Sequence, residues 1–180
     1  MRFVDTDLQV TATAALSTPF DFETTFTANY RRVARVILRI VGDPARAEDL
    51  AVDAFSRLLN HPSAQGPGVD GWLYRTGVRL GLDELRRRAR RERYDRWLAF
   101  ALPPRTPDEL FASAQERGRV RTVLAALPRR QAELLVMRTD DVSHEDIARV
   151  LAVKPASVTV LLSRAKQAFR KEYVKRYGQR

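Results

Sequence analysis

Cysteine is absent from this chain of 180 residues, and that absence removes several kinds of chemistry. Without thiols there is no disulfide framework, no thiolate metal site and no cysteine nucleophile. Histidine is almost as scarce, because the only two are His61, in a loop bounded by proline, and His144, at an expected helix start. The segment HEDIA at His144 lacks the second histidine of a zinc helix of the H-E-x-x-H type. We therefore expect no metal, no cofactor, no catalytic residue and no enzymatic activity.

Long apolar runs are missing as well. No run of about 18 apolar residues occurs, and the first residues, MRFVDTDLQV, carry two acids and no apolar segment of signal-peptide length. We expect a cytoplasmic protein without membrane insertion. Acidic residues are also in deficit, with 22 Asp and Glu against 32 Lys and Arg, so the net charge is +10 and the pI is near 10.7. Such a basic chain favours a polyanionic partner, either nucleic acid or a membrane surface.

The remaining pattern is helical from end to end. Apolar residues recur three or four positions apart, and no segment alternates as a strand would. Asp21 and Gly42 bound a first helix, Asp43 and Pro44 begin a second, and a third, long helix starts at about Asp70. Four more helical segments follow the proline-rich stretch ALPPRTPDEL, through which a continuous helix is improbable. The sequence predicts an all-α fold of two small helical domains joined by a Pro-containing linker.

Four parts make up the expected organisation. The proline-rich stretch places the boundary, and Thr106 and Glu109 form a capping-box start for the helix that follows it. The parts are a flexible tail at 1–18, a helical domain at 19–96, a linker at 97–107 and a helix-turn-helix domain at 108–180.

The run LDELRRRARRER, residues 82–93, contains six arginines. In a helix, this run and the turn before it would have one narrow apolar side, formed by Val78, Leu82, Leu85 and Ala89, that packs against the domain. Glu84 and Glu92 are too few to neutralise the arginines by i,i+4 pairing, so like charges would repel one another. A phosphate partner would remove that repulsion. The alternative is an ordinary solvated helix face.

Aromatic residues stand just upstream on the same expected helix. Trp72 and Tyr74 lie beside Arg75 and Arg79 in the segment GWLYRTGVR. Rings next to arginines suit single-stranded nucleic acid, because any base can stack on a ring while the cation holds the backbone. Either ring could equally be a core residue.

The segment SHEDIARVLAVKPASVTVLLSRAK has the pattern of a helix-turn-helix. Ser143 is its N-cap, and the stretch from Val153 to Pro155 separates the two helices. One face of the second helix would be free to enter a major groove, with Ser157, Thr159, Val160, Ser163, Arg164 and Gln167. Helical hairpins of this kind also occur as packing units in proteins that never touch DNA.

Together these segments resemble the extracytoplasmic-function group of the bacterial sigma-70 family of transcription initiation factors. The stretches ARAEDLAVDAFSRLL, GWLYRTGVRLGLDELRRRARR, LPRRQAELLVMR and SHEDIARVL occur in that family's order and spacing, over about residues 20–173. The resemblance implies a sigma factor that binds core RNA polymerase and directs promoter recognition at the −10 and −35 elements. The alternative is a one-component helix-turn-helix regulator that does not act through core polymerase.

The resemblance also implies site residues and partners. Core polymerase would be bound by Glu48, Asp49, Asp53 and Phe55. The −10 promoter DNA would be bound by Trp72, Tyr74, Arg75, Arg79, Arg86, Arg87, Arg88, Arg90 and Arg91, with the loop NHPSAQGPGVDG at the place where the family captures a flipped base. The −35 DNA would meet the free face of the last helix, and an anti-sigma factor could hold two mobile domains together with their DNA faces covered.

Departures from the family pattern carry consequences. Ala152 stands in the hairpin turn where a glycine is common, and alanine bears a steric cost if that position needs a positive φ. Thr159, Val160 and Leu161 stand where many members have Lys, Ser and Arg. Methyl groups can contact the thymine methyl but cannot make bidentate bonds to guanine, so we expect a weaker or more thymine-directed −35 readout.

Overall fold

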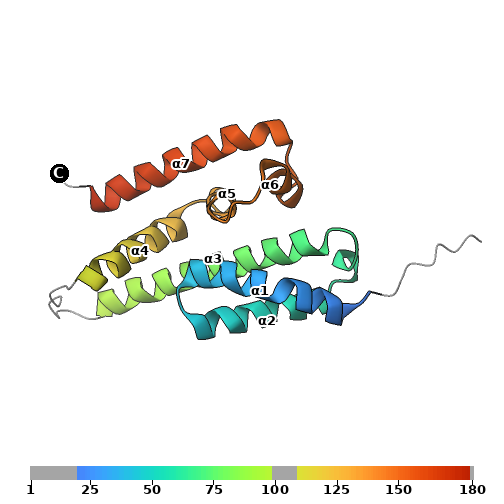
Figure 1. Ribbon diagram of the computed structural model, residues 1–180. Coiled ribbons are helices and arrows are strands. Elements are labelled where there is room, and N and C mark those ends of the chain that lie inside the picture. Colours follow the sequence, from blue (N-terminus) through green and yellow to red (C-terminus); the bar gives the residue numbers. More distant parts are fainter. Residues whose placement is uncertain (1–19, 99–108, 179–180) are drawn as a thin grey trace, which may run out of the picture.

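The computed structural model describes residues 20–98 and 109–178, and in this part of the chain every regular element is a helix (Figure 1). The α-helices are α1 (Phe22–Val41), α2 (Pro44–Leu59), α3 (Val69–Leu98), α4 (Glu109–Ala126), α5 (Arg129–Thr139), α6 (His144–Leu151) and α7 (Pro155–Tyr177), with a 3₁₀ turn, η1 (Pro62–Ala64), before α3. The all-α prediction is confirmed. The predicted tail at 1–18, residues 99–107 of the predicted linker and the Thr106 part of the predicted capping box lie outside the described residues.

The helix ends follow the local signals in the sequence. Asp21 accepts a hydrogen bond of 3.1 Å from the Thr24 backbone N–H at the start of α1. Gly42 ends that helix at φ 72°, in the left-handed region that glycine adopts without strain. Asp43 caps α2, and Ser143 caps α6 by accepting from the Asp146 N–H at 3.1 Å. These ends agree with the sequence predictions.

Helices α1, α2 and α3 pack against one another and form the N-terminal half of the core. Two glycines of α3 let α1 approach closely. A Cβ at Gly77 would lie 3.0 Å from a methyl carbon of Val33, and a Cβ at Gly81 would lie 3.0 Å from one of Ile40. Of the seam expected to pack on the domain, Val78, Leu82 and Leu85 are buried and Ala89 is half-buried.

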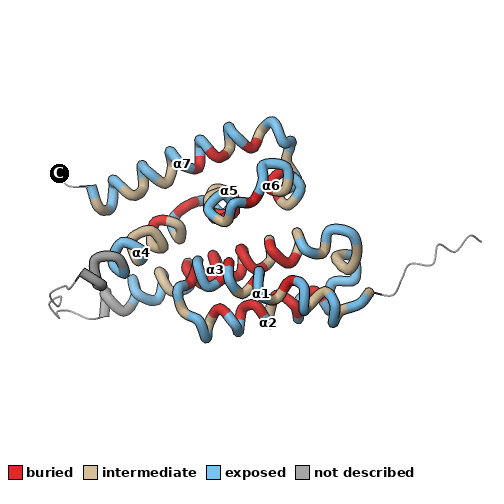
Figure 2. Tube along the Cα trace, in the orientation of Figure 1, coloured by how far each residue is buried: buried red, intermediate tan, exposed pale blue. Residues whose placement is uncertain are grey.

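The C-terminal helices form a second packed unit. Helix α7 contacts α4, α5 and α6, and its inner face buries Val158, Leu162 and Ala165. Leu161 and Phe169, also expected on that face, are half-buried. Exposed segments, in pale blue, recur along the whole length of α7 (Figure 2).

The two units lie directly against each other. Figure 1 shows α1–α3 on one side, α7 on the other, and α4–α6 between them. Helix α3 contacts α4, α5 and α6, and the buried side chains of both units belong to one hydrophobic cluster. Among the helices of residues 20–98 and 109–178, none combines the length and apolar character needed to cross a bilayer.

Candidate nucleic-acid interface

The free face of α7 is the more accessible of the two predicted DNA surfaces. Thr159, Ser163, Arg164 and Gln167 are exposed, and Ser157 is half-buried. Val160 is 52% exposed, although it is an apolar residue. A helix-turn-helix presents its second helix to the major groove in this way. The surface has three hydroxyls, the methyl groups of Val160, one guanidinium and the amide of Gln167 for contact with base edges.

The turn before α7 places Ala152 in the left-handed region. Its φ is 52° and its ψ is 53°, and its N–H closes the end of α6. An L-residue with a Cβ pays about 1–2 kcal/mol for this conformation, and glycine does not. This position therefore has the positive φ at which the sequence analysis expects alanine to bear a steric cost.

Tyr74 lies in the core rather than on a surface. It is 1% exposed, and its hydroxyl donates a hydrogen bond of 2.9 Å to the Oδ2 atom of Asp140. The guanidinium of Arg32 covers its ring at 4.6 Å from the centroid. Burial, reinforced by the Asp140 carboxylate, raises the pKa of Tyr74 far above its ordinary value. In this arrangement its ring is closed to DNA.

The other members of the predicted −10 set near the start of α3 differ in their surroundings. Trp72 is half-buried and stacks on His61 from the loop before α3, with ring centroids 5.7 Å apart. Arg75 is half-buried, burial lowers its pKa, and its Nε is an unsatisfied buried atom among the described residues. Arg79 donates from Nε to Oε1 of Glu133 at 2.9 Å.

The arginine run is organised around one buried acid, Glu84. Its side chain is 4% exposed, and the guanidinium groups that surround it belong to Arg46, Arg87, Arg88 and Arg91, at 3.1, 2.8, 3.2 and 3.6 Å. Burial acts to raise the pKa of Glu84, but hydrogen bonds from Arg46 and Arg88 outweigh it and hold that pKa below its ordinary value. Glu84 and Glu92 are too few to neutralise the run by i,i+4 pairing alone, but four arginines converge on the single carboxylate of Glu84.

Two arginines of the run also tie helices together. Arg88 reaches Asp43 at 3.1 Å, and Arg86 donates to the Leu127 carbonyl at 3.2 Å. Arg87 and Arg91 keep 51% and 60% of their side chains exposed, and Arg90 is exposed. The run therefore has a structural part, Arg86 and Arg88, and an outward part, Arg87, Arg90 and Arg91, whose guanidinium groups are accessible to phosphate.

The predicted polymerase-binding residues lie on α2, on the side of the molecule away from α7 (Figure 1). Glu48 and Asp49 are exposed, and Asp53 is half-buried and paired with Arg57 at 3.1 Å. Phe55 is 2% exposed. Its ring packs among Phe22, Phe26 and Tyr30, so the aromatic residue supports α2 from inside while the acids face outward.

Two acids that the sequence argument did not single out hold central positions. Glu133 of α5 is 2% exposed and pairs with Arg79, and Asp140 at the end of α5 pairs with both Arg39 and Tyr74. The sequence does contain a signal for Glu133, because this acid stands among the apolar residues of α5. An ionised carboxylate at such a position needs a charged partner. Within the described residues no cluster of three or more acids and histidines is suited to a metal ion.

Comparison with known proteins finds a family match in each of the two packed units. Residues 25–91 match the family Sigma-70 region 2, and residues 117–169 match the family Sigma-70, region 4. The chain is 31% identical over 147 residues to the ECF RNA polymerase sigma factor SigE of Mycolicibacterium smegmatis, covering 77% of this chain and 56% of that protein. It is 29% identical over 163 residues to the probable RNA polymerase sigma factor RfaY of Xanthomonas campestris pv. campestris, covering 84% of this chain and 40% of that one.

The chain thus spans about half the length of these curated relatives. Among solved structures it is similar to the sigma factor RpoE in its co-crystal with the anti-sigma factor NepR from Bartonella quintana, with a TM-score of 0.49 and 19% identity over 84% of this chain and 96% of that one. The family is one of initiation factors and not of enzymes. Region 2 followed by region 4, in helices that carry the expected motifs, places this chain in the extracytoplasmic-function group of the sigma-70 family.

Proposed function

We propose that this protein binds core RNA polymerase and directs it to promoters by recognising −10 and −35 elements. In this proposal the outward acids of α2, Glu48, Asp49 and Asp53, contact the polymerase, and Phe55 fixes their helix in the domain. The single observation that carries the proposal is that acidic, arginine-aromatic and helix-turn-helix elements occur on one chain that matches sigma-70 regions 2 and 4. Core polymerase and promoter DNA are cytoplasmic in bacteria, so the proposal also places the protein there.

The DNA contacts divide between the two units. The α7 face with Thr159, Val160 and Arg164 reads −35 duplex, and its exposure supports that role. Trp72 and Arg75 meet the opened −10 strand, and the outward arginines of α3 bind phosphate. An anti-sigma partner stays a prediction from the family resemblance.

Charge reversal on α2 tests the polymerase contact. The double variant E48K/D49K should bind bacterial core polymerase about tenfold more weakly, because two exposed carboxylates that face a complementary surface become repulsive. Co-elution with purified core enzyme on gel filtration measures the binding, and run-off transcription from sheared genomic DNA measures promoter use.

The matched control is E23K/E145K, which reverses two exposed acids on α1 and α6 outside the predicted contacts. It should bind like the unmodified protein. If the unmodified protein neither co-elutes with core polymerase nor supports transcription, the proposed function is wrong, and the one-component regulator becomes the better description.

A further inference from the structure

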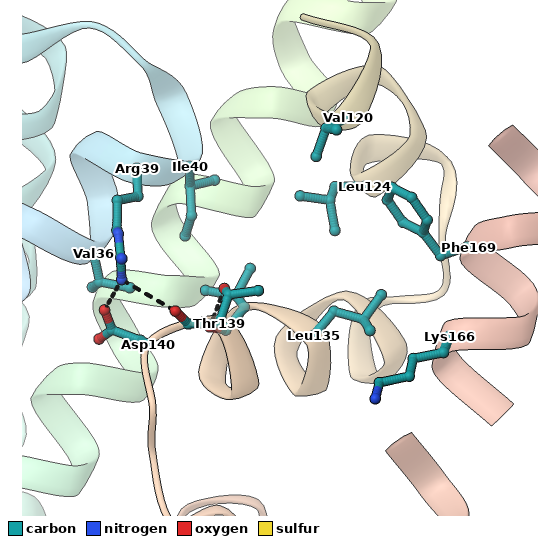
Figure 3. A pocket seen from close by; sticks show the side chains of 11 residues that line it. Val36, Arg39, Ile40, Val120, Leu124, Leu135, Thr139, Asp140, Lys166 and Phe169 are labelled. Atoms are coloured by element: carbon teal, nitrogen blue, oxygen red, sulfur yellow. Dashed lines mark hydrogen bonds and ion pairs between the residues drawn. The ribbon is translucent and has the colours of Figure 1, made fainter. Parts of the chain in front are cut away.

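Helices of both units enclose an apolar cavity that none of the predicted polymerase or DNA contacts uses. Its volume is about 380 Å³, and it lies between α1 of the first unit and α4, α5 and α7 of the second (Figure 3). The apolar side chains that line it are Val36, Ile40, Val120, Leu124, Leu135, Val136 and Phe169. Because these side chains come from four helices, the cavity is a product of how the two units dock.

A cavity of this size is unusual in a packed interior. Protein cores fill space about as densely as organic crystals, and side chains that face a void lose the dispersion contacts of close packing. Water is a poor occupant, because a water molecule in a cavity needs about two to four polar partners and this lining is mostly apolar. The volume falls within the range of about 300–1,000 Å³ that is typical of small-molecule sites. These properties favour an apolar ligand.

The edges of the cavity are cationic. Arg39 of α1 and Lys166 of α7 both line it, and Figure 3 shows them well separated from each other. Arg39 pairs with Asp140, which also accepts the Tyr74 hydroxyl, so both oxygens of this lining carboxylate are already bonded. Lys166 is exposed and forms no hydrogen bond or ion pair with another residue of 20–98 or 109–178. Its ammonium is therefore available to an anion at the edge of the cavity.

The apolar lining and the available ammonium together define the chemistry of the ligand. At about 30 Å³ for each heavy atom, the share of one molecule in liquid water, the cavity holds roughly a dozen heavy atoms. A fatty-acid anion of about ten carbons has this size, with an alkyl chain for the lining and a carboxylate for the ammonium of Lys166. A cationic amphiphile would meet like charge at Lys166, and a neutral one would leave that ammonium without a partner.

We propose that this cavity binds a medium-chain fatty-acid anion, with the alkyl chain among the apolar side chains and the carboxylate on Lys166. The proposal goes beyond the proposed function, because the site involves neither DNA nor polymerase. A ligand bound there touches α1 of region 2 and three helices of region 4, so it stabilises the contact between the units. The concentration of a small molecule would then set how firmly the units are joined.

A chain-length series of fatty-acid anions tests the apolar part of the site. Hexanoate, octanoate and decanoate are titrated, below their micelle concentrations, into the full chain labelled for methyl NMR. The methyl signals of Leu124 and Leu135 should shift and saturate at one equivalent, and those of Leu73, in the core of region 2, should stay in place. Each methylene group that leaves water should tighten binding about fourfold, so each step of two carbons should lower the Kd about 15-fold. Tetradecanoate should gain less, because its last carbons exceed the cavity.

The variant K166M tests the carboxylate contact, since methionine keeps most of the side-chain length and removes the charge. K166M should bind octanoate about tenfold more weakly than the parent and should bind octan-1-ol equally well. The matched control is K171M, which removes the same charge from an exposed position of α7 outside the cavity lining. It should bind octanoate like the parent. Equal weakening in K166M and K171M would mean that overall positive charge attracts the anion, and it would overturn the proposal.

Filling the cavity tests where the ligand lies. L124W should abolish the saturable binding of decanoate, because the indole occupies the space of the alkyl chain, and V120W gives a second route if L124W does not fold. Decanoate should raise the thermal midpoint of the parent and leave that of the folded tryptophan variant unchanged. Undiminished binding by the folded variant, binding of several equivalents, or no shift of the Leu124 and Leu135 signals in the parent would overturn the proposal. None of these results depends on polymerase, so a failure of the proposed function is recognised separately by its own co-elution test.

Discussion

Ala152 shows at the scale of one residue how the fold can carry a local cost. It is exposed, so no packing requires its methyl group, and it sits at φ 52° between the two helices of the DNA-binding motif. The helix-turn-helix forms because the apolar faces of α6 and α7 are buried against each other, and α7 also packs against α5. The burial of those faces outweighs the strain at one turn residue.

The change A152G should therefore stabilise the protein. Glycine removes the steric cost of the left-handed conformation, and this gain exceeds the free energy lost to the greater backbone entropy of glycine in the unfolded chain. We therefore expect the free energy of unfolding to rise by about 0.5–1 kcal/mol. Urea denaturation followed by circular dichroism measures the difference. The control A156G, at an exposed helical position of α7, should lower stability by up to about 1 kcal/mol. Equal losses in both variants would contradict the strain at residue 152.

At the scale of the element, α3 combines a binding surface with a structural tie. Glu84 gathers arginines from α2 and α3, and the surrounding guanidinium groups favour its ionised form enough to lower its pKa despite burial. A carboxyl whose pKa is lowered by folding adds stability at pH values above its unfolded pKa. That stability is lost as the pH falls toward the folded pKa.

The variant E84Q should lose this contribution to the pH dependence of stability. At pH 7 we expect the free energy of unfolding to fall by about 1–2 kcal/mol, because partly exposed arginines lose a buried charged partner. Between about pH 5 and pH 3 the stability of E84Q should then decline less steeply than that of the parent. Thermal unfolding across this range measures the effect, with E145Q, an exposed glutamate of α6, as control. Parallel pH profiles for E84Q and parent would contradict the structural role of Glu84.

The helices themselves could be read from the sequence, because their signals are local. Caps such as Asp21 and Ser143 bond within three residues, and the apolar period repeats every turn. The roles of individual side chains on those helices were less accessible. Tyr74 could be either core or DNA-binding from its spacing alone, and its burial depends on Asp140, which lies 66 residues away. No local pattern encodes such a pair.

At the scale of the whole molecule, the same limit applies to the packing of the two units. The sequence indicated the proline-rich stretch and two helical domains, and it led to an expectation of mobile units. The structure instead joins their buried residues in one cluster, with Arg79–Glu133 and Arg129–Asp83 across the contact. Nothing in the spacing of those residues predicts that they meet, since the contact depends on how two complete helical units dock.

A joint core has a consequence for unfolding. When one unit unfolds, it exposes apolar surface on the other and removes the partner of Glu133, so the parent chain should unfold in a single calorimetric transition. In E133Q/D140N the units are expected to lose this coupling, and the single peak should separate into two. The control D141N/E145Q, which changes two exposed acids beside α5 and α6, should keep one peak. Two transitions in the parent would mean that the units are stable independently and that the contact between them adds little to stability.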